Sequence, residues 1–261
     1  MCGIAGYSLS QSSRVDRTRA AQALLAGVAE RGADAAGYAY RCGLSAVSVH
    51  KRRTGATGLL DDVRVPTEAT QLLVHVRDYT KGHPRIAGNN HPVRHGTVVG
   101  VHNGIIVNDD DLFARHGIER HEPQMTVDSE VIFALAARSR GRTARTLEQL
   151  HGSMAAAWLD EERPELVLTR GMGRPVWIGT GRAEVFFAST RLALELVERY
   201  GGARLRKREL ADGTLLALDD GRIASHEGFS PDFSFEEEPL PAVRAPQEGR
   251  SCLQRLAALA T

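Results

Sequence analysis

The second residue of the chain is a cysteine, a position that gives it two reactive groups once the first residue is removed. Cys2 follows Met1 directly, and cysteine is small enough for methionine aminopeptidase to expose it. The mature residue would carry a thiol and a free α-amine. Because the reference pKa of an α-amine is about 7.7 to 8.0, this group can act as general base for its own side chain. Cys2 is therefore a candidate nucleophile, although a cysteine without any task also fits this position when it is considered alone.

Further glycine-rich and polar motifs follow Cys2 in a fixed order. They are RGADAAG at 31–37, HVRDYTKG at 75–82, NHP at 90–92, HNGII at 102–106 and VDSEVI at 127–132. Together with MCGIAGY at the start, this set resembles the glutaminase domain of class II glutamine amidotransferases, which are N-terminal nucleophile hydrolases. RGADAAG and HNGII look closest to the domain of glucosamine-6-phosphate synthase. The resemblance covers roughly residues 2–224, and several ordered motifs are much more specific than any single one.

The HNGII motif offers hydrogen-bond donors for an oxyanion. Attack of a Cys2 thiolate on an amide makes a tetrahedral oxyanion, which needs donors aimed at it. The Asn103 side chain and the Gly104 backbone N–H can supply two. An Asn-Gly pair after an apolar strand also indicates an ordinary hairpin turn, and the residues alone leave both readings open. The resemblance implies that this turn is itself the oxyanion hole.

Three residues match the charged end of glutamine. Arg77 is planar and permanently charged and can bind the α-carboxylate bidentately, while Thr80 can add a hydroxyl and Asp128 can bind the α-ammonium. Without context, such residues are more often surface ion-pair partners or helix caps. The resemblance implies that these positions bind glutamine.

Three more residues are candidates for shaping the pocket. The resemblance implies that Arg31 and Asp34 support the nucleophile, and Arg31 is equally compatible with an ordinary cation at a helix end. His91 can help to form the pocket wall, although a lone histidine is more often structural.

The chain departs from the synthase pattern between the glutamine-binding arginine and the following glycine. That pattern has a tryptophan directly after the arginine and a histidine three residues later, where this chain has Asp78 and Lys81. We therefore expect a different lid over the glutamine site, and a different coupling of glutamine hydrolysis to an acceptor site.

The elements that must position these residues can be predicted from apolar periodicity. Strands are expected at 3–9, 36–41, 45–52, 72–77, 97–102, 155–160, 166–169, 176–178 and 185–188, and a hairpin at 215–225. Helices are expected at 16–30, 128–139 and 143–151. Because strands cluster without regular alternation with helices, the pattern predicts an α+β fold. The resemblance specifies a four-layer αββα sandwich of the N-terminal nucleophile hydrolase type.

The composition changes near the end of the resemblance. Residues 225–261 are rich in acid and proline, which favours an extended tail. We therefore expect a glutaminase domain at 1–224 and a tail at 225–261. Residues 250–259 could form a short helix with leucines on one face, docking on the body or on a partner, or could be a frayed end.

The bulk composition excludes several classes of function. A net charge of +1 among 261 residues gives no basic excess for nucleic acid. No apolar run reaches the roughly 18 residues of a membrane span and no leader is evident, so a cytoplasmic protein is expected. Three scattered cysteines make neither a disulfide framework nor a metal knuckle. We expect no metal and no cofactor.

These features predict an enzyme that hydrolyses L-glutamine to glutamate through a γ-glutamyl thioester on Cys2. Because no acceptor domain follows in the sequence, the ammonia is expected to pass to a separate synthase protein. One alternative is an amidase of a γ-glutamyl compound that delivers ammonia to no partner. The other is a non-catalytic scaffold subunit with the same fold.

Overall fold

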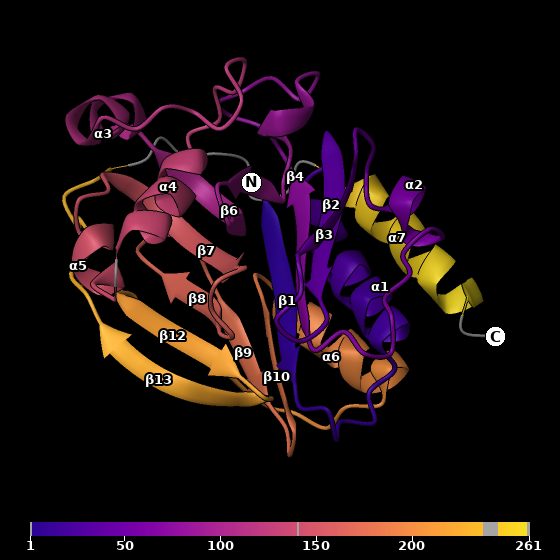
Figure 1. Cartoon of the computed structure of the whole chain (residues 1–261). Coiled ribbons are helices and arrows are strands. Elements are labelled where there is room, and N and C mark those ends of the chain that lie inside the picture. Colours follow the sequence, from indigo (N-terminus) through magenta and orange to yellow (C-terminus); the bar gives the residue numbers. More distant parts are fainter. Residues whose placement is uncertain (1, 140, 237–244, 260–261) are drawn as a thin grey trace.

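The computed structural model describes residues 2–139, 141–236 and 245–259, which form four layers with helices outside and two sheets inside (Figure 1). All strand pairs of the described residues are antiparallel. The expected αββα sandwich is therefore confirmed.

The first sheet places the N-terminal strand at its centre. Its order is β11 (Arg206–Glu209), β9 (Trp177–Thr180), β10 (Glu184–Ala188), β1 (Gly3–Leu9), β4 (Gln71–Arg77), β2 (Ala35–Arg41) and β3 (Ser48–Arg52). Every residue of β1 is buried, because the strand has a neighbour on both sides and a packed layer on both faces. A strand buried on both faces reads as a continuous run of apolar and small residues, as GIAGYSL does.

The second sheet carries the HNGII motif. Its order is β13 (Arg222–Gly228), β12 (Thr214–Asp219), β8 (Leu166–Arg170), β7 (Gly152–Asp160), β6 (Val98–Ile106) and β5 (Val93–His95). The expected turn at Asn103 and Gly104 is wrong, because β6 continues through both residues and pairs them with Ala155 and Met154 of β7. The neighbouring strand thus overrides the local turn preference of Asn-Gly.

Helices cover the outer face of each sheet (Figure 1). Against the first sheet lie α1 (Arg17–Val28), α2 (Thr57–Leu60), α6 (Arg191–Leu196) and α7 (Pro246–Leu259); over the second lie α3 (Asp109–His116), α4 (Glu130–Arg138) and α5 (Thr143–Leu147). Short helical turns also occur in the chain, at η1 (Ala29–Arg31), η2 (Ala87–Asn89) and η3 (Val197–Gly201). Within the described part of the chain, no helix combines the length and apolar character needed to cross a bilayer.

The core has three parts that correspond to the spaces between the layers. One lies between the first sheet and α1, α6 and α7, the second between the second sheet and α3 to α5, and the third between the two sheets. Ile4 of β1 and Val101 of β6 both belong to the part between the sheets. The inward faces of β1 and β6 therefore look toward each other.

A buried arginine ties the sheets together at the end remote from Cys2. Arg41 ends β2 and is fully buried. Its guanidinium donates to Gln71 Oε1 at 2.8 Å and to the carbonyl oxygens of Asp160, Arg163 and Pro164, each at 2.6 Å. Because those carbonyls come from the β7–β8 connection, this side chain joins the second sheet to the first.

Strand β13 and helix α7, both within the expected tail or across its start, belong to the folded body. β13 runs to Gly228, past the expected domain boundary at 224. Helix α7 includes the segment 250–259 and packs against α1, α2 and η1. Leu256 is fully buried, so the leucine face is covered by the domain itself. Residues 237–244, which the expected tail also contains, lie outside the described residues.

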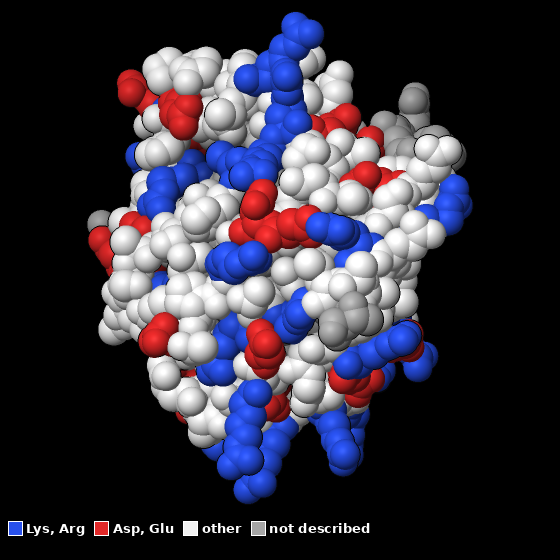
Figure 2. Space-filling view, turned by 90° about the vertical axis from the view of Figure 1, so that its right-hand side faces the viewer, with Lys and Arg blue, Asp and Glu red and all other residues white. Residues whose placement is uncertain are grey.

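The surface over α2 and α7 carries charges of both signs. Figure 2 shows acidic and basic side chains next to each other on this face. Arg255 of α7, for example, pairs with Asp61 after α2 through its Nε at 2.8 Å. Mixed charge of this kind gives a solvated face and no extended field of one sign.

We expect Leu256→Ala to lower the free energy of unfolding by about 2 to 5 kcal/mol, because it opens a cavity in the core part that α7 shares with α1. Urea unfolding would measure the change. Leu44→Ala is the control, since Leu44 is 69% exposed and its truncation should change stability by less than about 0.5 kcal/mol. Equal stability of both variants would show that α7 contributes nothing to the fold.

Candidate active site

Strand pairing places Cys2 beside the end of β4. Gly3 lies opposite Val76 and Ile4 opposite His75, so the next step of this register sets Cys2 opposite Arg77. The Asp78 backbone N–H donates to Cys2 Sγ at 3.5 Å, and Sγ lies 3.4 Å from the Asp78 carbonyl oxygen. The half-buried thiol therefore sits where residues 78–82 leave the sheet; this segment is called the glutamine loop after the ligand expected from the sequence.

The surroundings of Cys2 keep its thiol protonated. Burial raises the pKa of Cys2, while the Asp78 N–H bond and the positive charge of Arg77 oppose that rise. Since the net shift is upward, a base must take the proton before Sγ can attack. A free α-amine on the same residue would be such a base.

Arg31 and Asp34 hold the nucleophile and the start of the glutamine loop. Arg31 Nε donates to the Cys2 carbonyl oxygen at 2.9 Å. Asp34 Oδ2 accepts from the Tyr79 N–H at 2.9 Å, and the Asp34 N–H donates to the Arg77 carbonyl at 3.0 Å. Both residues thus lie where supports of the pocket were predicted.

The Arg77 guanidinium, at the end of β4, points toward the glutamine loop. It donates to Asn90 Oδ1 at 2.6 Å, to the Lys81 carbonyl at 3.0 Å and to the Gly82 carbonyl. Both Nη2 hydrogens are thereby used, which leaves Nε–H and one Nη1–H of the five donors. In this arrangement Arg77 cannot bind a carboxylate bidentately, contrary to expectation, unless the loop carbonyls move.

Asn103 supplies a donor that no protein group uses. Its side chain is 1% exposed, and Nδ2 has no hydrogen-bond partner among the described residues. Alternation along β6 sets Asn103 on the same face as Val101, just as alternation along β1 sets Cys2 on the face of Ile4. A buried N–H without a partner is costly unless something else accepts its hydrogen bond, and an oxyanion would do so.

Gly104 adopts a backbone conformation that other residues avoid. Its φ is +148°, and a Cβ there would lie 1.9 Å from the Ser153 carbonyl oxygen. The position therefore requires glycine, and this need exists whether or not its N–H serves an oxyanion.

Asp128 is a buried carboxylate just before α4. It is 3% exposed, and its Oδ2 accepts from the Ile106 N–H at 2.8 Å. Burial raises the pKa of Asp128 to about 6, although the Ile106 bond acts in the opposite direction. A buried carboxylate whose charge is disfavoured in this way suits an ammonium ligand.

His91 lies in the interior beside a second histidine. Its ring stacks on His75 with 4.1 Å between centroids, and neither ring nitrogen of His91 has a partner among the described residues. Burial holds the pKa of His91 well below its usual value, so the ring is neutral. Thr80, unlike the buried His91, lies exposed in the glutamine loop.

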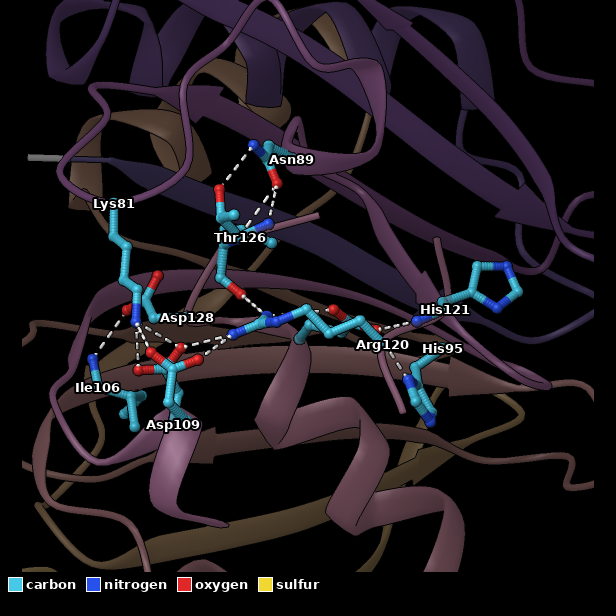
Figure 3. A network of polar contacts seen from close by, with 12 residues as sticks. Lys81, Asn89, His95, Ile106, Asp109, Arg120, His121, Thr126 and Asp128 are labelled. Atoms are coloured by element: carbon cyan, nitrogen blue, oxygen red, sulfur yellow. Dashed lines mark hydrogen bonds and ion pairs between the residues drawn. The ribbon is translucent and has the colours of Figure 1, made fainter. Parts of the chain in front are cut away.

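Two asparagines take part in the site without having been predicted. Asn90 holds the Arg77 guanidinium, and Asn89 Oδ1 accepts from the N–H groups of Thr126 at 2.8 Å and Val127 at 3.1 Å (Figure 3). The NHP motif at 90–92 marked this segment, but nothing in the residue pattern indicated which groups the amides would meet.

Comparison with known proteins agrees with this geometry. A family described as "Glutamine amidotransferase domain" matches residues 83–195. The glutamine–fructose-6-phosphate aminotransferase (isomerizing) of Caulobacter vibrioides is 33% identical over 229 residues, which are 84% of this chain and 36% of that protein. The chain belongs to the class II glutamine amidotransferases. The corresponding aminotransferase of Shigella flexneri is 31% identical over 76% of this chain and 33% of its own length.

A solved class II amidotransferase shares the fold. The glutamine phosphoribosylpyrophosphate amidotransferase of B. subtilis superposes with a TM-score of 0.69 and 22% identity, covering 88% of this chain and 49% of that one. The present chain spans about a third of the length of the two aminotransferases above.

The raised pKa of Asp128 predicts a gain in stability when its charge is removed. Its folded pKa of about 6 lies above the unfolded value of about 3.9, so stability is lost as pH rises from the unfolded to the folded pKa, and the loss is complete above about pH 6. Asp128→Asn should raise the free energy of unfolding by about 2 to 3 kcal/mol at pH 7.5, and by much less at pH 4.5.

Chemical unfolding at the two pH values measures this effect. Asp111→Asn, a change at an exposed acid of α3, serves as control and should alter stability by less than about 0.5 kcal/mol. A pH-independent effect of Asp128→Asn would contradict the assigned shift.

Proposed function

We propose that this amidotransferase is a glutaminase that hydrolyses L-glutamine to glutamate and ammonia through a thioester on Cys2. The observation that carries the proposal is the half-buried Cys2 Sγ at the end of β4, with the unpartnered Asn103 amide on the facing strand. A nucleophile and a buried donor without a partner are two groups that acyl transfer needs.

The reaction can be written with these residues. The α-amine of Cys2 takes the thiol proton, directly or through water, and Sγ attacks the side-chain carbonyl carbon of glutamine. Asn103 and the Gly104 N–H stabilise the oxyanion. The α-ammonium then gives a proton to the departing amine, ammonia leaves, and the γ-glutamyl thioester remains. Water attacks the thioester, which releases glutamate and restores the thiol.

The charged end of the substrate would meet Arg77, Thr80 and Asp128. The α-carboxylate would take one free hydrogen of Arg77, or two after the Lys81 and Gly82 carbonyls release Nη2, and Thr80 would add its hydroxyl from the loop. The α-ammonium would pair with Asp128, whose ionised form is then favoured.

The proposed function also requires an acceptor for the ammonia. The similar aminotransferases are named for transfer to fructose 6-phosphate, and this chain spans about a third of their length. We propose that the acceptor site lies on a separate synthase acting on a carbohydrate or specialised metabolite. A synthase that co-purifies would support this assignment. Efficient turnover of free glutamine that no partner changes would favour the stand-alone amidase.

The N-terminal base predicts a dependence on processing. Protein that begins at Cys2 should release glutamate from glutamine, whereas protein that retains Met1 should be nearly inactive because its Cys2 nitrogen is then an amide without basicity. Mass spectrometry would establish the two forms, and a glutamate assay would compare them. Cys2→Ala is the blank. Equal turnover by both forms would exclude the α-amine as base.

The oxyanion donor predicts a selective loss of rate. Asn103→Ala should lower kcat on glutamine by about 10²- to 10³-fold with much less change in KM, because the bond forms in the transition state. Steady-state kinetics would measure both constants. A large rise in KM with kcat intact would show that Asn103 binds the ground-state substrate instead.

The scaffold alternative has its own test. A glutamine-like electrophile should label Cys2 in the native chain and leave Cys2→Ala unlabelled. A native chain that stays unlabelled would favour a non-catalytic subunit.

A further inference from the structure

One cation of the glutamine loop reaches a buried carboxylate on another element. Lys81 Nζ lies 2.7 Å from Asp109 Oδ1 and 2.8 Å from Asp109 Oδ2 at the start of α3, and 2.9 Å from Asp110 Oδ2 (Figure 3). The Asp109 side chain is 1% exposed, while that of Asp110 is 74% exposed. The ion pair with Asp110 is exposed to solvent and contributes little to stability. The ion pair with the buried Asp109 is therefore the one that holds the loop.

The same carboxylate is linked to the segment that carries Asp128. Arg120 donates to Asp109 Oδ2 at 3.0 Å and to the Val127 carbonyl at 2.9 Å, and its Nη1 lies 3.3 Å from the fully buried Glu130 (Figure 3). Asp109 thus touches two cations, one from the glutamine loop and one bound to the backbone beside Asp128. The close view shows these groups converging between the loop and the start of α4.

The loop is tethered at both of its edges. Asp34 accepts from the N–H of Tyr79, and Arg77 donates to the carbonyls of Lys81 and Gly82. These bonds fix the loop to the first sheet. The side chain of Lys81 connects this loop to α3 through its ion pair with Asp109, so it spans from the layer of the nucleophile to the layer of Asp128.

We propose that Lys81 and Asp109 form a latch that positions the glutamine loop over Cys2 and keeps it in register with Asp128. Lys81 is a positioning residue in this proposal, because it contacts neither Cys2 nor Asp128 in the structure. The proposal rests on the function proposed above and adds to it the residues that set loop closure in this chain.

The latch also sets the electrostatic surroundings of Asp128. Asp109 of α3 raises the pKa of Asp128, and Lys81 of the loop lowers it. Arg77 faces Asp128 from β4, while Arg120 and Glu130 lie around the start of α4. Removing Lys81 should therefore raise the pKa of Asp128 further, and removing the charge of Asp109 should lower it.

Two substitutions separate the positioning of the loop from the change of charge near Asp128. Lys81→Met and Asp109→Asn each break the latch, but they change the charge near Asp128 in opposite senses. Both should increase amide hydrogen exchange of residues 78–82 and speed the alkylation of Cys2 by iodoacetamide severalfold. The lower step of the acid limb of kcat/KM for glutamine, which reports Asp128 and lies below the step of the Cys2 α-amine, should move to higher pH in Lys81→Met, by about one unit or tenfold in rate along that step. In Asp109→Asn it should move to lower pH.

Matched variants make the result specific. Lys207→Met breaks the ion pair of Lys207 on β11 with Glu198 of η3, away from the site, and should change neither exchange nor the pH profile. Lys81→Arg keeps the charge and should restore most of the native exchange. Lys81 is 39% exposed, so its replacement should not prevent folding even if Asp109→Asn does.

The outcomes distinguish this proposal from the proposed function. If native protein hydrolyses no glutamine, the function fails, and exchange and alkylation still test the latch. Unchanged exchange and alkylation in Lys81→Met would overturn the latch whatever the activity. Shifts of the acid limb in the same direction for Lys81→Met and Asp109→Asn would overturn the link to Asp128.

Discussion

The antiparallel pairing of β1 with β4 is the constraint on which the site depends. β1 lies between β10 and β4 in the middle of a sheet, so backbone hydrogen bonds fix it on both sides. The residue before it is therefore placed by the sheet rather than by a flexible terminus. The same pairing brings the end of β4, and with it Arg77 and the Asp78 N–H, next to Sγ. A slip of one residue would turn Cys2 to the opposite face.

Around this frame, burial makes the charged groups of the site sensitive to one another. Water stabilises an exposed carboxylate, but Asp128 depends on the backbone N–H groups of Ile106 and Ser129 and on the sum of nearby charges. Cys2 is likewise kept neutral until a base acts. In the proposed function the substrate would complete these interactions, because its ammonium would stabilise the charge of Asp128 and its oxyanion would accept from Asn103. Recognition and reactivity would then follow from one arrangement of incompletely compensated polar groups.

Much of the fold was predictable because β1, β4 and α1 have strong local patterns. The helix of α1 repeats apolar residues at Ala20, Leu24 and Val28, and Asp16 caps it. Asn103-Gly104 was assigned wrongly to a turn because pairing with β7, distant in sequence, decides its conformation. The motifs identified the family, while the roles assigned to the individual site residues stay predictions. No periodicity connects Lys81 with Asp109, so this contact was visible only in three dimensions.

The buried Arg41 concentrates side-chain hydrogen bonds between the two sheets at one end of the sandwich. Its guanidinium joins Gln71 of the first sheet to the end of β7 and to the β7–β8 connection of the second. Cys2 lies beside the opposite end of β4. Replacing Arg41 would therefore leave buried carbonyl oxygens without a donor and weaken the packing of the sheets, while no contact of the Cys2 thiol would be removed.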